Sequence, residues 1–336
     1  PAGLADHPPV VAPWARHDHV MNLTSRRTLL TSVAAAAATL PLVNDLAGNG
    51  RTAVAAESVE FASNAALYSS ADYEEGVHWM RRFRCGTPVT LNDYAKDPSA
   101  TAPSNLLTSA PVRSTAILAP HGGGLEAGTT ELCLTIAGYD RAEPGTEPRP
   151  DTGTPGAVQR DYWMFETLTA SRPAPVKPLH VTATHCDDPA ALAVCSHNLY
   201  AVSLHGYLPD DDPLVKRILI GGRDQRLIRN LASAFDRHGL NASLGVEVVV
   251  AGSDAELNGD DPANIVNRTR TGAGAQLETS TELRRAMFGT FGSGSGRRGT
   301  AGQASPTAPD APAYWHGFVD AVREAVDRHE RGLDSL

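Results

Sequence analysis

Residues 114–137 read STAILAPHGGGLEAGTTELCLTIA, and this stretch decides the class of fold. The apolar run at 114–119 predicts a buried strand, and the run at 129–137 predicts a helix that ends at Gly138. Three glycines at 122–124 separate the two runs. Because glycine has no Cβ, this turn can adopt positive φ and approach a ligand closely. A strand that enters a helix through a glycine turn indicates an α/β protein.

The rest of the chain continues this alternation. Its patterns predict further strands at 179–184, 199–204, 217–220, 245–251 and 275–278, and helices at 188–195, 224–238 and 313–330. The last helix carries one apolar stripe, formed by Trp315, Phe318, Val319, Val322 and Val326. Strands that alternate with helices predict a three-layer α/β/α fold with a mixed, mostly parallel central sheet, in a single catalytic domain at 57–336.

Two segments rich in glycine and proline interrupt this pattern. Residues 140–156 (DRAEPGTEPRPDTGTPG) predict a surface loop. Residues 289–312 (GTFGSGSGRRGTAGQASPTAPDAP) predict a flexible insertion within the catalytic domain, without a helix or a strand.

The first part of the chain resembles an export signal. From Met21 the sequence reads MNLTSRRTLLTSVAAAAATLPLVNDLAGNGRTAVAAE, with Arg26 and Arg27 before a weak apolar run and an A-x-A site at 53–55. These features predict a twin-arginine (Tat) signal peptide at 21–56, and therefore a secreted protein that uses the Tat export machinery. Residues 1–20 are interpreted as a leader or a misassigned start. The alternative, an amphipathic helix after two arginines, lacks a polar face at helical spacing.

Composition and charge exclude several classes of protein. The 336 residues are 41% hydrophobic, which supports a folded core. The formal net charge of −9 argues against a nucleic-acid binder, which needs a basic face. No apolar run is long enough to span a bilayer and the signal has no lipobox cysteine, so we expect no stable membrane anchor. Four cysteines without a CxxC pair indicate neither a disulfide scaffold nor a zinc ribbon.

Polar residues collect where the predicted strands end, which is where functional groups gather in open α/β sheets. His121 and Glu126 flank the glycine turn, while His205 and Glu278 each end a later strand. Two histidines and one glutamate form a known catalytic zinc set, in which three protein ligands leave a fourth position for water. Glu278 can supply the further carboxylate that such a site needs as a general base. Glu131 competes with Glu126 as the third ligand, but Glu126 is preferred because Glu131 should already lie in the helix.

Six motifs, in chain order, resemble those of the poly-γ-glutamate hydrolase family: HGGGLEAGTTEL, THCDDP, SLHG, IGGRD, NR and GAQLE. Members of this family are bacterial and phage zinc peptidases, similar in fold to carboxypeptidase A, that cleave γ-glutamyl bonds. The resemblance implies Zn²⁺ held by His121, Glu126 and His205. It also implies that Glu278 is the catalytic carboxylate, which takes a proton from water and passes it to the leaving nitrogen.

The resemblance covers most of the chain after the signal, from Ser69 to Arg285 and the closing helix. Two features depart from the family pattern. Cys186 stands where the family usually has an aromatic residue, and the segment 289–312 is an addition to the compact members. Neither change affects the proposed ligands, but both bear on the identity of the substrate.

A polyanionic substrate requires local cations, because the chain itself is net negative. A planar guanidinium binds a carboxylate in a bidentate way, so Arg268 with Asn267 is predicted to hold a substrate carboxylate. Arg223 is a second candidate, although Gly-Gly-Arg-Asp also fits a strand-to-helix turn in which Asp224 is the N-cap. The expected partner is an anionic peptide or polymer, bound by a monomer.

Other functions share some of these motifs. Some esterases use HGGG as an oxyanion hole, but no G-x-S-x-G nucleophile elbow follows here, since the run at 292–296 has glycine at its centre. The same zinc chemistry would also serve a carboxypeptidase or amidase that acts on short peptides or wall fragments. A non-catalytic binder of an anionic polymer would need the arginines and not the metal. The sequence leaves the last two functions open.

Overall fold

The computed structural model describes residues 61–86, 113–154, 157–168, 179–253, 255 and 257–334. All of these fall within one compact unit, Ala56–Leu336. The predicted leader at 1–20 and the predicted Tat signal at 21–56 lie outside the described residues. None of the helices in the described ranges is both long and apolar enough to cross a membrane.

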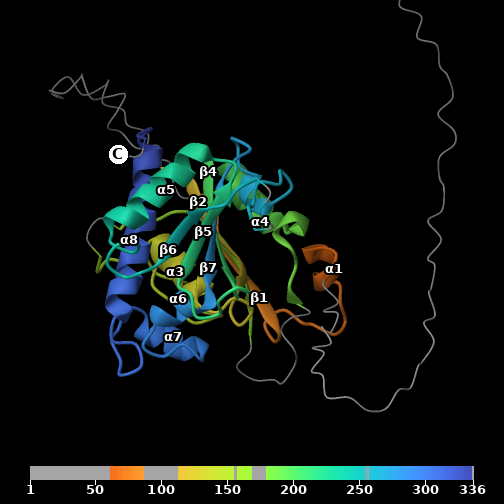
Figure 1. Cartoon of the computed structure of the whole chain (residues 1–336). Helices are drawn as coiled ribbons and strands as arrows, with labels where there is room; N and C mark the ends of the chain where they lie inside the picture. The colour runs from red at the N-terminus through yellow and green to blue at the C-terminus, as the bar shows by residue number, and fades with distance from the viewer. Residues whose placement is uncertain are drawn as a thin grey trace, which may run out of the picture. The chain divides into compact units, whose positions relative to one another are not determined.

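A seven-stranded sheet forms the centre of this unit, with the strand order β1-β3-β2-β4-β7-β5-β6 (Figure 1). The strands are β1 (Trp79–Arg84), β2 (Thr115–Gly122), β3 (Tyr162–Thr167), β4 (Tyr200–Tyr207), β5 (Arg217–Gly222), β6 (Glu247–Val250) and β7 (Ala275–Ser280). Four of the six pairings are parallel, while β1–β3 and β5–β7 are antiparallel. The predicted mixed, mostly parallel sheet is confirmed.

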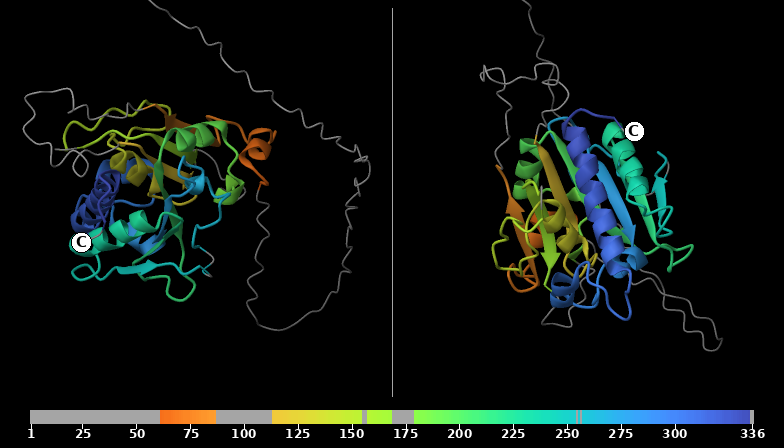
Figure 2. Two further views of the ribbon diagram at one scale, coloured as in Figure 1. Left: turned by 90° about the horizontal axis from the view of Figure 1, so that it is seen from above. Right: turned by 90° about the vertical axis from the view of Figure 1, so that its left-hand side faces the viewer.

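Helices cover both faces of the sheet. One face carries α3 (Thr129–Ile136), α5 (Gln225–Arg237), α6 (Thr281–Ala286) and α8 (Ala311–Glu330). The other carries α1 (Asn64–Tyr68), the 3₁₀ turns η5 (Ala183–His185) and η6 (Ile265–Asn267), and α4 (Pro189–His197). The right-hand view of Figure 2 shows α8 and α5 lying across the first of these faces. We call the two faces the α8 face and the α4 face.

The central strands are buried on both sides, which explains their continuous apolar runs. In β2, Ile117 and Ala119 belong to the core on the α8 face, whereas Ala116 and Leu118 belong to the core on the α4 face. Successive side chains of a strand point to opposite faces, so a strand between two helical layers must be apolar throughout. The three-layer α/β/α arrangement follows from this double burial.

Several segments differ from the sequence-based expectations. The patterns do not predict β1 or β3, and all six residues of β3 are buried, so it shows no alternation. The strand predicted at 179–184 is wrong, because the segment holds only η5. Leu179 and Val181 are both buried. The alternation of apolar and polar residues here therefore marks one buried side of the segment and does not indicate a strand.

The prediction that the segment 289–312 contains no helix is also wrong. This segment contains the helix α7 (Gly294–Thr300), and Arg297 within it is only 5% exposed. Its order comes from contacts that composition does not show, above all an ion pair between Arg297 and the buried Glu131.

Candidate metal centre

An irregularity in β2 turns His121 toward the α4 face. The pairing of β2 with β3 advances three residues on β2, from Ala119 to Gly122, against two on β3. Such a bulge breaks the alternation of side chains, and without it His121 would point to the α8 face as Ile117 does. With it, His121 Nε2 lies 3.0 Å from the carbonyl oxygen of Val181, a residue of the core on the α4 face.

The glycine loop, residues 122–128, brings Glu126 back to His121. The Glu126 N–H donates to the His121 carbonyl oxygen over 2.9 Å, which closes a tight turn. Glu126 Oε1 then lies 2.7 Å from His121 Nδ1, and Oε2 accepts from the Gly206 N–H over 2.8 Å. Gly123 has φ +69°, and a Cβ there would lie 2.2 Å from the Thr167 carbonyl oxygen, so this point of the loop requires glycine.

His205 completes the cluster from β4. Its Nδ1 lies 3.2 Å from His121 Nδ1 and 3.8 Å from Glu126 Oε2. One ligand atom from each of the three residues lies within 4.8 Å of the others, so they form a candidate metal site. Burial lowers the pKa of His205 to about 3, so its ring is neutral at neutral pH and can present a lone pair.

The arrangement of lone pairs fits a bound cation. The Val181 carbonyl can only accept, so His121 Nε2 carries a proton and Nδ1 is the ring nitrogen left to bind a metal. Nδ1 lies 2.7 Å from a carboxylate oxygen of Glu126. Such a short contact requires a positive charge between the two atoms, either a proton on Nδ1 or a metal ion that both atoms bind. A histidine that donates its other N–H to a carbonyl is typical of metal ligands, and two imidazoles with one carboxylate suit zinc.

Glu278 lies directly beside His205, where β7 pairs in parallel with β4. It is 5% exposed, and burial together with the negative charge of Glu126 raises its pKa well above the usual range. Gln276 Nε2 donates to Glu278 Oε1 over 3.0 Å, and Asn264 Nδ2 donates to Gln276 Oε1 over 2.8 Å. The two amides therefore orient a carboxyl whose raised pKa suits proton transfer.

Arg284 is a buried member of the site that the sequence patterns miss. Its guanidinium donates to the carbonyl oxygens of Ala127 and Thr279, over 2.8 and 3.2 Å, and so ties the glycine loop to β7. It also packs on Gly206, where a Cβ would lie 2.3 Å from its Cζ. Burial raises the pKa of Glu126, but the contact with His121 and the charge of the Arg284 guanidinium outweigh burial and hold it below its usual range. Two adjacent arginines in TELRRA give no signal of which one is buried.

A cavity of about 430 Å³ opens over this cluster. Residues of the segments 180–184 and 257–261 line it together with the cluster, Glu278, Asn264 and Gln276. The ring of His180, another residue that the sequence patterns miss, has its centroid 4.0 Å from that of His121. Within the described part of the chain, no lysine or arginine lines this cavity, whereas the exposed Asp260 and Asp261 do.

Asn267 and Arg268, predicted to hold a substrate carboxylate, do not line the cavity. Both N–H donors of the Asn267 amide bind backbone carbonyl oxygens, those of Gly259 and Asp261, each over 2.8 Å. Its Oδ1 accepts from the Gly274 N–H over 3.1 Å. The amide of Asn267 thus fixes the backbone of the segment that precedes β7. The next residue, Arg268, is exposed to solvent.

Arg223 also lies away from the metal centre. It lines a neighbouring cavity of about 470 Å³, and its N–H donates to the Gly274 carbonyl oxygen over 2.9 Å. The physical reason is that β5 runs antiparallel to β7, so the carboxyl end of β5 meets the amino end of β7. Asp224 caps α5 by accepting from the Leu227 N–H over 3.0 Å, which confirms the strand-to-helix turn considered as the alternative.

Comparisons of sequence find proteins that are similar to this chain. A family model of poly-gamma-glutamate hydrolase matches residues 151–305, which include His205 and Glu278. The SPbeta prophage-derived UPF0714 protein YoqZ of Bacillus subtilis (strain 168) is 35% identical over 199 residues, 59% of this chain and 60% of that protein. The UPF0714 protein YndL of the same strain is 31% identical over 196 residues, 58% of this chain and 64% of that protein. The chain thus spans less than two thirds of the length of these curated relatives.

Comparisons of structure agree. A bacteriophage poly-gamma-glutamate hydrolase matches with a TM-score of 0.53 and 25% identity, over 80% of this chain and 97% of that one. A zinc-free structure of YndL matches with a TM-score of 0.54 and 22% identity, over 81% of this chain and 99% of that one. In its motifs, in its sequence over residues 151–305 and in its fold, the chain is similar to the poly-gamma-glutamate hydrolase family.

Proposed function

We propose that the chain is a zinc-dependent hydrolase that cleaves γ-glutamyl amide bonds, such as those of poly-γ-glutamate. The observation that carries the proposal is the convergence of His121, Glu126 and His205 beside the buried Glu278. Similarity to the family supports hydrolysis, and the zinc-free form described for YndL supports zinc as the metal.

The site residues divide the chemistry among them. His121, Glu126 and His205 would hold the ion, and a bound zinc supplies Lewis acidity that makes water nucleophilic and polarises an amide carbonyl. Glu278 accepts a proton from the attacking water and delivers it to the leaving nitrogen. Gln276 holds Glu278 in place through its amide for both transfers.

The cavity also favours a second substrate class, short γ-glutamyl peptides or wall fragments that carry an amino group. Asp260 and Asp261 contribute negative charge to a lining whose described residues include no lysine or arginine. A polyanion would bring further carboxylates to these groups, whereas an amino group would be attracted to them. The protein would then be an amidase with the same zinc chemistry.

Secretion through the Tat machinery, as a monomer, is part of the proposal and is supported by the twin-arginine motif and the A-x-A site within 21–56. N-terminal sequencing of the protein recovered from culture medium, with a twin-lysine variant as the control, tests the export route.

Digestion of poly-γ-glutamate by the zinc-loaded protein tests the proposed reaction. We expect the polymer to shorten on size-exclusion chromatography as amines are released, activity to disappear with a chelator, and stoichiometric zinc to restore it. A γ-glutamyl peptide with a free amino group, assayed beside the polymer, separates the two substrate classes. Protein that holds one zinc per chain and cleaves neither substrate would contradict the hydrolase assignment.

A further inference from the structure

Arg297 is a buried arginine that the proposed chemistry does not use. It lies in α7, within the segment 289–312, and is 5% exposed. Ser293 begins this helix by accepting from the Gly296 N–H over 3.1 Å, which gives the arginine a defined local frame. A buried guanidinium must be paired and hydrogen-bonded, because an unpaired buried charge is strongly destabilising. Its partners therefore show what holds α7 against the body of the protein.

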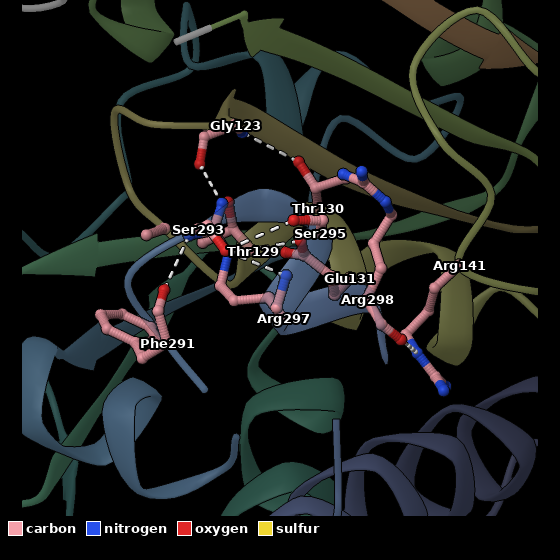
Figure 3. Close-up of polar contacts among 12 residues, drawn as sticks. Gly123, Thr129, Thr130, Glu131, Arg141, Phe291, Ser293, Ser295, Arg297 and Arg298 are labelled. Carbon is pink, nitrogen blue, oxygen red and sulfur yellow. Dashed lines mark hydrogen bonds and ion pairs between the residues drawn. The ribbon is translucent and has the colours of Figure 1, made fainter. Parts of the chain in front are cut away.

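All three guanidinium nitrogens of Arg297 are engaged (Figure 3). Nε donates to Glu131 Oε1 over 3.3 Å, Nη1 to the Phe291 carbonyl oxygen over 2.9 Å, and Nη2 to the Gly123 carbonyl oxygen over 2.9 Å. Glu131 lies in the first turn of α3 and is itself buried. One guanidinium thus connects α3, the segment 289–312 and the glycine loop.

Gly123 is the point at which this network reaches the metal centre. It stands two residues after His121 and three before Glu126. Its N–H donates to Thr130 Oγ1 over 3.0 Å, so both backbone polar groups of Gly123 are held by side chains. At the other end of the same loop a second buried arginine, Arg284, binds a carbonyl oxygen. The glycine loop, which carries Glu126 and follows His121, is therefore held at both ends.

We propose that Arg297 is a positioning residue for the metal centre, which acts by fixing the glycine loop through the Gly123 carbonyl. This inference rests on the proposed zinc function. Without the guanidinium, Gly123 and Glu131 lose their shared partner and the loop gains freedom. Glu126 is then held less firmly opposite the two histidines, so the protein binds zinc more weakly.

The zinc dissociation constant, measured by competition with a chromophoric chelator, tests this role without an activity assay. We expect Arg297→Met to bind zinc about ten- to hundredfold more weakly, the usual effect of losing a group that orients metal ligands. Arg297→Lys should be intermediate, because a single ammonium does not reproduce the fork of the guanidinium. The matched control is Arg298→Met, one residue along α7, where the side chain pairs with an exposed Glu143 at 3.4 Å. We expect that control to stay within about twofold of the wild type.

Thermal melts of the metal-free proteins separate positioning from folding. An Arg297→Met protein with a lower Tm but an unchanged zinc dissociation constant would show a purely structural role and overturn the inference. If Arg297→Met does not fold, an unchanged zinc affinity in folded Arg297→Lys would overturn it equally. A wild type that binds no zinc would instead refute the proposed function, and the positioning role with it.

Discussion

Two polar side chains, one toward each end of β7, are used in opposite ways. At the carboxyl end, Glu278 is buried beside His205, and the negative charge of Glu126 helps to raise its pKa. At the amino end, Asn267 uses both its N–H donors and its carbonyl oxygen on backbone groups. A buried polar side chain is suited to catalysis where a neighbouring charge shifts its pKa. It stabilises the structure where backbone groups satisfy all of its hydrogen bonds.

The largest expected effect comes from the carboxyl end. Glu278→Gln removes the proton acceptor but preserves the shape of the side chain, so we expect kcat to fall about 10²- to 10⁴-fold. The zinc content should not change, because Glu278 is not among the three ligand candidates. Steady-state kinetics with elemental analysis checks both expectations. Retained turnover would remove Glu278 from the role of general base.

Two asparagines three residues apart sharpen the comparison. Asn264 reaches Glu278 through Gln276, whereas the Asn267 amide binds the backbone of Gly259, Asp261 and Gly274. We expect Asn264→Ala to lower kcat about tenfold, which corresponds to one lost hydrogen bond of about 1.4 kcal/mol. Asn267→Ala should leave kcat of the folded protein within about twofold and lower the free energy of unfolding by about 2 kcal/mol.

Kinetics and denaturant unfolding of both variants, side by side, check this contrast. Both substitutions remove a backbone contact, so some loss of stability is expected in each. Equal losses of kcat in the two variants would mean that the two ends of β7 do not differ as described.

The smallest effect is expected for Arg223→Ala. The side chain is exposed, and its backbone N–H, which the substitution retains, is bound to the amino end of β7. We therefore expect KM for poly-γ-glutamate to change by no more than about twofold, as for most exposed positions. A tenfold rise in KM, measured at low ionic strength where charge effects are greatest, would return Arg223 to the substrate-binding residues.

The parallel strands account for what could be predicted of the site. The histidine at 205 and the glutamate at 278 lie near the carboxyl ends of two neighbouring strands that run in parallel, so their position after an apolar run predicts that they meet. The same rule fails at Arg223, because β5 runs antiparallel and its end lies at the opposite edge. Strand direction depends on pairing between distant segments, and local sequence does not encode it.

Burial of single polar residues was equally beyond prediction. Arg284 and Arg297 each stand beside another arginine in a short polar stretch, and nothing local distinguishes the buried one. Their order comes from partners far along the chain, 157 and 174 residues away. Composition alone predicts a flexible segment at 289–312, since glycine and serine favour flexibility when no such partner exists.

By itself, the sequence determined the alternation of strands and helices, the glycine loop with its two ligand candidates, and the motifs of the family, because each depends on residues close together in the chain. Only the tertiary structure decided that His121 faces His205, since a one-residue bulge in β2 selects the face. It also decided that Asn264 is linked to Glu278 through Gln276 and that Arg284 binds the glycine loop, whereas Asn267 binds backbone carbonyl oxygens and Arg268 is exposed. Side-chain periodicity is local, but the face on which a side chain meets its partners depends on how distant strands pair.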